Sequence, residues 1–267
     1  MRLFSAFIVR DFLNETSYRF SFLLSVGAII FNVFIFYFLS EFIDQATTPI
    51  AAGADVDYFS FLLIGIAFGS YFNAGLTSFS ASLRDAQVTG TLEAMLMTPT
   101  PLSAIVTGSA AWSYVFTTFR VLVYLLVGML ISGLRFTGAN YLAALAGLVL
   151  AIISFASIGI GAAAVIMVIK RGNPVTVLFA SVANLVSGVY YPVEVLPDWL
   201  QVIARLMPLT YALRLMRQAL LAGASWSALA NDFLALIIFC LVLFPLSLIL
   251  FRAAVQRARL EGTLAHY

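Results

Sequence analysis

The chain has 267 residues, of which 63% are hydrophobic and 10% are charged, whereas about a quarter of the residues in soluble domains are charged. This composition excludes an ordinary soluble domain, because too few polar side chains are present to cover an apolar core. The formal net charge of +2 gives no support to nucleic-acid binding.

The N-terminal segment, residues 1–19, is too charged to cross a bilayer. Its apolar residues fall on one helical face and its polar residues on another, which predicts an amphipathic helix lying in the membrane interface. The apolar face holds Phe4, Phe7, Ile8 and Phe12. A plain charged lead-in to the first membrane span is the alternative.

Six apolar runs are long enough to form transmembrane helices, for which about 20 residues are needed. Arg120 is the only acidic or basic side chain inside them. With no repeat or second domain in the chain, this pattern predicts an all-α, multi-pass membrane protein with one domain, residues 1–267. The runs lie near Phe20–Leu39, Tyr58–Ser80, Gly108–Leu134, Tyr141–Ile169, Val175–Tyr191 and Phe233–Phe251.

An even number of spans places both termini on one side of the membrane, and the distribution of basic residues indicates which side. With the N-terminus inside, nine Lys and Arg residues lie in cytoplasmic segments and four in outer ones. The first outer loop, Glu41–Asp57, contains four acidic residues and no basic one. The positive-inside rule therefore predicts that both termini are cytoplasmic.

Segment 84–107, between the second and third spans, is then cytoplasmic. Its part "GTLEAMLMT", Gly90–Thr98, is compatible with a short helix, and Glu93 near its start favours the helix dipole. Leu92, Met95 and Leu96 form one apolar face. Such a helix either lies on the bilayer or inserts into a soluble partner, and these residues alone do not decide between the two.

The segment from residue 190 to 232 combines apolar residues with three prolines and three arginines. Proline interrupts helices by removing a donor and clashing with the preceding turn. This predicts two short helices that enter the outer leaflet and return, forming an outer re-entrant segment between the last two spans.

The sequence contains few residues that could catalyse a reaction. The single histidine, His266, is next to the C-terminal residue, and the acidic residues lie outside the predicted apolar cores. No metal site and no intramembrane acid–base pair is therefore predicted. The chain has no glycine-rich phosphate loop, so any ATP that drives it must bind another chain. Cys240, in an apolar run, is expected to pack as a small hydrophobe.

Several residues inside or beside the spans have two interpretations. Arg120 is either part of a transport pathway or a cation that reaches polar neighbours or the interface. Tyr190 and Tyr191, like Trp199, fit an outer aromatic belt, or else line a substrate exit. Gly65 and Gly69 allow close helix packing, within one chain in preference to a dimer. Lys170–Arg171 marks an inside loop, with or without a partner contact.

Two stretches carry a resemblance to a known family. "GTLEAMLMTPTPLSAIVTG", residues 90–108, resembles the cytoplasmic loop between spans two and three in permeases of type-2 exporters among the ATP-binding cassette (ABC) transporters. "GVYYPVEVLPDWLQVIARLMPLTYALRLMRQALLAG", residues 188–223, is similar to that family's outer re-entrant segment. Before the first stretch, only Arg84 and Asp85 match the charged lead that family members show.

The resemblance implies a permease subunit that exports a lipid-like, glycan-linked or drug-like substrate across the cell (inner or plasma) membrane. Two permease chains, identical or paralogous, would pair in the bilayer, each above an ATPase subunit that binds ATP and Mg²⁺. This chain itself would bind no cofactor or metal and would catalyse no reaction. The residues implied to contact the ATPase, through a coupling helix, are Arg84, Asp85, Gly90, Thr91, Leu92, Glu93, Met95, Leu96 and Pro99.

Two other function classes remain open at this point. A stand-alone channel or an ion-coupled carrier would have a similar composition, and a neighbouring reading frame for an ATPase would argue against both. A membrane-embedded transferase would need a polar catalytic cluster, which the sequence does not contain.

Overall fold

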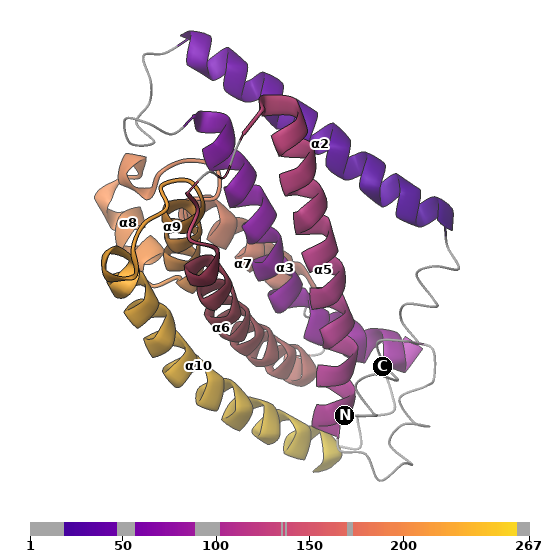
Figure 1. Ribbon diagram of the computed structural model, residues 1–267. Helices are drawn as coiled ribbons and strands as arrows, with labels where there is room; N and C mark the ends of the chain where they lie inside the picture. The colour runs from indigo at the N-terminus through magenta and orange to yellow at the C-terminus, as the bar shows by residue number, and fades with distance from the viewer. Residues whose placement is uncertain are drawn as a thin grey trace.

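The computed structural model describes residues 19–46, 57–88, 102–134, 136, 138–169 and 173–260. Within these ranges every regular element is a helix, which agrees with the predicted all-α class (Figure 1). The predicted interface helix at residues 1–19 falls almost wholly outside them. In chain order the elements are α2 (Arg19–Ala46), α3 (Tyr58–Val88), α5 (Leu102–Ser132), α6 (Tyr141–Ile169), α7 (Asn173–Val186), the 3-10 turn η1 (Val193–Val195), α8 (Asp198–Arg205), α9 (Pro208–Leu220) and α10 (Trp226–Leu260).

Five of these helices are long and apolar enough to cross a membrane. They coincide with the first, second, third, fourth and sixth predicted spans. The apolar parts are Phe22–Ile43 in α2, Tyr58–Ala81 in α3, Ala110–Ser132 in α5, Tyr141–Met167 in α6 and Trp226–Arg257 in α10.

The fifth predicted span, Val175–Tyr191, forms a shorter helix than the sequence suggested. Helix α7 has 14 residues, or about 21 Å of length, against about 30 Å of bilayer hydrocarbon. The helix stops at Val186, and the chain turns at Gly188, whose φ of 84° favours glycine. The described structure therefore supplies five helices of spanning length and not six.

Between α7 and α10 the chain forms η1 and two short helices, α8 and α9. Two short helices were predicted here and two are present. Their entry into the outer leaflet stays a prediction. Pro208 occupies the first turn of α9, where no N–H is needed. The Thr210 hydroxyl donates to the Ala204 carbonyl at 2.8 Å, which ties α9 to the end of α8.

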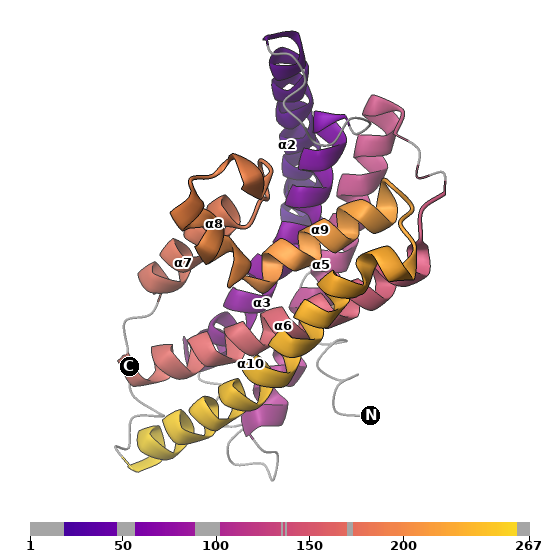
Figure 2. The same cartoon turned by 90° about the vertical axis from the view of Figure 1, so that its left-hand side faces the viewer.

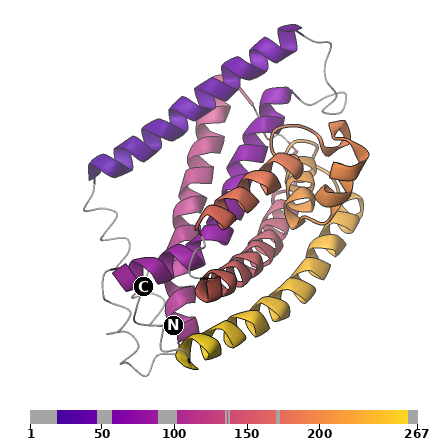
Figure 3. The ribbon, with the colours of Figure 1, turned by 180° about the vertical axis from the view of Figure 1, so that it is seen from behind.

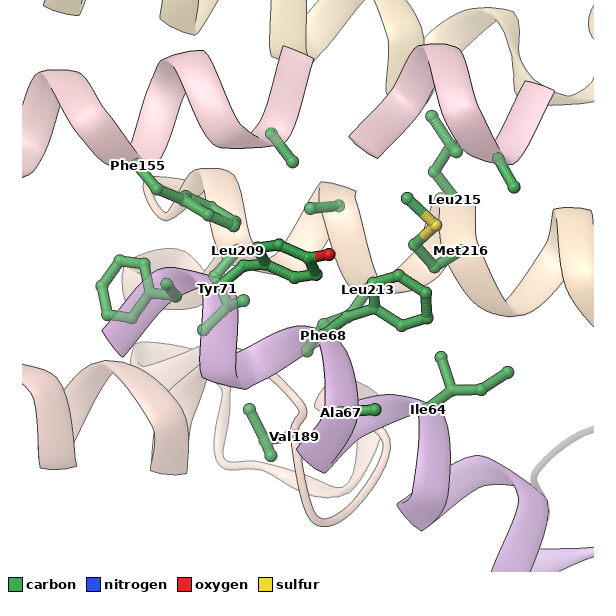
Figure 4. Close-up of a cluster of buried hydrophobic side chains, with 14 of the residues drawn as sticks. Ile64, Ala67, Phe68, Tyr71, Phe155, Val189, Leu209, Leu213, Leu215 and Met216 are labelled. Carbon is green, nitrogen blue, oxygen red and sulfur yellow. The ribbon is translucent and has the colours of Figure 1, made fainter. Parts of the chain in front are cut away.

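The main hydrophobic core surrounds α3. Ile64, Ala67 and Phe68 of α3 are buried against α9, and Tyr71 extends the same cluster (Figure 4). Figure 4 also shows Phe155 of α6 and Val189 of the turn after α7 beside this helix. Further members from α9 are Leu209, Leu213, Leu215 and Met216. Most of the apolar part of α3 is buried, whereas little of α2 or α10 is, so α3 is the central helix of the described structure.

The other long helices surround this centre unequally. Helices α6 and α10 run side by side (Figure 2), and α5 packs along α3. Helix α2 lies at the edge, where it contacts α3 and α5 (Figure 3). Most of its large apolar side chains, from Phe20 to Phe42, are exposed. A helix that is apolar all round and little covered by its own chain is typical of a membrane span.

The end of α3, the start of α5 and the end of α10 lie at one end of the molecule (Figures 1 and 3). A second cluster of buried residues joins α3, α5, α6 and α10, through Phe79, Ala110, Ile160 and Phe251 among others. A movement of one helix at this end would therefore displace the other three, because closely packed interiors transmit strain.

Candidate functional site

Arg120 lies in the middle of the apolar part of α5 and is exposed on the surface of the chain. Its guanidinium carbon is 4.4 Å from the centre of the Phe116 ring, one turn earlier on the same helix face. This geometry is that of a cation–π contact. No hydrogen bond or ion pair of Arg120 is found within the described residues.

Phe116 belongs to a row of aromatic rings beside this arginine. Trp112 and Phe119 each stack on Phe116, with ring centres 6.3 Å apart in both cases. Phe22 of α2 adds a further ring, 5.5 Å from Phe119. We call Trp112, Phe116, Phe119 and Phe22 the aromatic row. It gives the surface around Arg120 a continuous apolar and polarisable lining.

Two of the three predicted pathway residues, Arg120 and Tyr190, both lie beside α2. Phe22 of α2 packs on Phe119, the residue next to Arg120 in α5. The Tyr190 ring stacks on Phe36 of α2 with centres 6.4 Å apart, and its carbonyl accepts a hydrogen bond from Tyr58 at 2.9 Å. Tyr191 is partly buried in the same turn, but no contact joins it to Arg120 in the described structure.

Arg217, a partly buried arginine that the sequence marks only as an outer charge, fixes the turn after α7. Arg217 of α9 donates to the Phe61 carbonyl at 3.1 and 3.3 Å and to the Val189 carbonyl at 3.1 Å. Its guanidinium also lies 3.4 Å from the centre of the Phe61 ring. Burial lowers the pKa of Arg217 to about 9, against the opposing effect of Glu194, so the side chain remains protonated at neutral pH.

Gly65 of α3 makes this junction possible. A Cβ at position 65 would collide with the Val189 carbonyl oxygen and would approach an Arg217 nitrogen to 2.6 Å. Gly69 faces Val189 and Asn184 at ordinary contact distances. The predicted close packing within one chain is therefore confirmed for Gly65, whose partners are a turn and an arginine, whereas Gly69 makes only ordinary contacts.

A second polar link, also missed from the sequence, joins α3 to α7. The Asn184 amide nitrogen donates to the Asn73 side-chain oxygen at 3.0 Å, and the Asn73 nitrogen donates to the Gly69 carbonyl at 3.1 Å. The side-chain oxygen of Asn184 is buried without a partner in the described structure. One asparagine in each of two predicted spans was the available signal, because amides inside membranes hydrogen-bond across helices.

The predicted ATPase contacts cannot be placed by their side chains. Arg84 and Asp85 lie on the last two turns of α3, where the structure describes the backbone alone. The other predicted contacts, Gly90, Thr91, Leu92, Glu93, Met95, Leu96 and Pro99, lie outside the described residues. Among the described residues, no group of three His, Cys, Asp or Glu side chains is arranged to hold a metal ion.

Helices of this length and apolarity, one of them carrying a cation at mid-depth, define a multi-pass membrane protein with a polar feature inside its spans. The chain belongs to the ABC-2 type transporter family, whose sequence pattern matches residues 2–221. The family is a transport permease domain and has no catalytic activity of its own. A comparison with curated proteins finds no match.

Proposed function

We propose that the chain is the permease subunit of an ATP-driven exporter and works as a pair with a second permease chain, identical or paralogous. The observation that carries this proposal is the family match across residues 2–221, which includes segment 84–107. ATP and Mg²⁺ bind to a separate ATPase subunit, since the chain has no phosphate loop of its own. The exported molecule is lipid-like, glycan-linked or drug-like, and the membrane is the cell's inner or plasma membrane.

Two helices are suited to carry force from that ATPase into the membrane. Helix α3 continues past its apolar run, through Arg84 and Asp85, to Val88, and α5 begins at Leu102. The coupling helix at Gly90–Thr98 lies between them in the sequence. Arg120 is about 27 Å along the unbroken helix α5 from Leu102, so a push at the start of α5 reaches the pathway region directly.

The sixth crossing is made by α7 together with the turn that follows it. A short helix can complete a crossing together with a turn, because irregular backbone at membrane depth is tolerated where protein shields it. The carbonyls of Val189 and Tyr190 in this turn accept hydrogen bonds from Arg217 and Tyr58. Six crossings, with more basic residues on the inside, place both termini in the cytoplasm.

The experiment that tests this function is co-expression with the ATPase of a neighbouring reading frame, followed by co-purification and a transport assay. Met95→Asp should weaken ATPase binding by about 30-fold, because a buried interface anchor contributes about 2 kcal/mol. Glu93→Gln should have a smaller effect, since rim charges contribute less.

Ala51→Asp is the matched control, because it adds the same charge to the outer loop, which is already acidic. It should leave binding and transport unchanged. Normal ATPase binding and transport by a correctly inserted Met95→Asp protein would contradict the coupling role. Flux through the chain without any ATPase would instead favour the channel.

A further inference from the structure

Arg120 occupies the least favourable depth in the membrane for a charge. It lies twelve residues after Gly108 and fourteen before Leu134, the limits of the predicted third span. These separations are about 18 and 21 Å along the helix. A cation at the centre of a span costs about 2.5–3.5 kcal/mol on insertion scales, so such residues are rarely retained without a role.

No carboxylate among the described residues pairs with Arg120. The acidic residues within the five apolar parts are Glu41 and Asp232. Glu41 is two residues from the end of its apolar part, and Asp232 pairs with Arg214 at 3.6 Å. A second identical chain would bring the same two carboxylates at the same depths, so it would not supply a partner at the middle of the membrane.

The contact with Phe116 leaves the donors of Arg120 available. A guanidinium that stacks on a ring uses its flat face, whereas its five N–H groups point outward in its own plane. Within the described residues none of these groups donates to an acceptor. Planar N–H pairs match the two oxygens of a phosphate group, and such bidentate pairs are among the strongest hydrogen bonds in proteins.

The neighbours of Arg120 suit an apolar tail. The aromatic row adjoins it, and Phe119, on the same side of α5, is 39% exposed. A small soluble anion would gain nothing from these rings. An amphiphile would lay its tail along them, in van der Waals contact, while its headgroup meets the arginine.

We propose that Arg120 and the aromatic row bind an amphiphile that carries a phosphate headgroup, and that this is the class of molecule which the transporter moves. The inference rests on the proposed function for the transport step. The binding step can be measured on this chain alone, with no ATPase present, so the two proposals can fail separately.

Binding can be measured through Trp112, which lies within the aromatic row. Trp199→Phe and Trp226→Phe leave Trp112 as the single tryptophan. The purified chain, in detergent micelles, is titrated with phosphatidic acid whose tails carry bromine, which quenches tryptophan on contact. Brominated phosphatidylcholine with identical tails and inorganic phosphate are titrated in parallel. We expect tight quenching by phosphatidic acid, weaker quenching by phosphatidylcholine and no displacement by inorganic phosphate.

Arg120→Gln should weaken binding of phosphatidic acid by at least about tenfold, to the level of phosphatidylcholine. Arg120→Lys keeps the charge but loses the planar donor pair, so its affinity should be intermediate. Arg205→Gln, at an exposed arginine at the end of α8, is the matched control and should bind normally.

Three results would overturn the proposal. They are an unchanged preference for phosphatidic acid in Arg120→Gln, equal binding of the two lipids by the parent chain, and full displacement by inorganic phosphate. Arg120→Lys keeps the test valid if the glutamine variant does not fold. If the chain binds phosphatidic acid as expected but never assembles with an ATPase, the proposed function is overturned and the proposed binding site stands.

Discussion

Arg217 shows how one side chain joins three distant parts of a membrane chain. It belongs to α9, yet its hydrogen bonds go to the carbonyls of Phe61 in α3 and Val189 after α7. The helical pattern of α9 indicates which face is apolar but does not reveal such remote backbone acceptors. The sequence therefore led us to count Arg217 as an outer charge, whereas Arg120 stood out as the single charge inside a span.

Gly65→Ala should destabilise the protein by about 1–3 kcal/mol, because the added methyl group overpacks a junction that contains backbone atoms. A carbonyl oxygen on a buried turn cannot move aside as a flexible side chain can, and the bonds of Arg217 would be strained with it. The measurement is thermal or denaturant unfolding of the purified protein in detergent.

Gly27→Ala provides the matched control for that change. Gly27 is in α2, and a Cβ there would meet no atom within 4 Å. The substitution should be neutral or slightly stabilising, since alanine is a better helix former than glycine. Equal stability of the two variants would show that the Gly65 junction is not tightly packed in the membrane protein.

Hydropathy predicted the presence of the long helices better than it predicted where helices end. Five apolar runs became five long helices because bilayer thickness dictates the length of such a run. Helix α7 ended early at a turn around Gly188 that lies inside an apolar run, where hydropathy carries no signal of a stop. Prolines revealed the two short helices α8 and α9, since proline marks interruptions independently of hydrophobicity.

The link between α3 and α7 can be measured as the interaction between Asn73 and Asn184. Each asparagine is replaced by leucine, singly and together, and unfolding free energies are compared in a double-mutant cycle. We expect a coupling energy of about 0.5–1.7 kcal/mol, the range found for hydrogen bonds inside membrane proteins.

A single change at Asn73 should cost more than half of the double change, because it leaves the Asn184 amide without its acceptor. Two substitutions with strictly additive effects would mean that the 3.0 Å hydrogen bond contributes nothing in the bilayer. Asn140→Ala is a useful comparison, because the amide of Asn140 bonds to the Ala224 carbonyl in a loop outside the spans.

The molecule as a whole has a central helix, α3, and a peripheral one, α2. The orientation of this assembly in the membrane follows from charge and not from packing, because the described structure would be equally stable either way up. Nine basic residues in predicted inside segments and four in outer ones set the expected direction. The number of crossings decides whether the two ends of the chain share a side.

Cysteine labelling in whole cells tests that orientation. In a Cys240→Ser background, Thr48→Cys should react with an impermeant reagent from outside, whereas Thr263→Cys should react only after the membrane is opened. A reporter fused after Ala224 should report the outer side. Labelling of both cysteines from outside would show that the predicted topology is wrong. A cytoplasmic reporter signal would show that the chain crosses the membrane once more.

The turn after α7 is held by its backbone, since Arg217 and Tyr58 grip the carbonyls of Val189 and Tyr190. Every amino acid offers the same carbonyl, so this grip is indifferent to the side chain at position 190. The Tyr190 ring is 37% exposed and stacks on Phe36 of α2. A substitution at position 190 would therefore lose the ring contact with Phe36 but keep the hydrogen bonds of the turn, and a lineage could acquire a new cargo there while keeping its architecture.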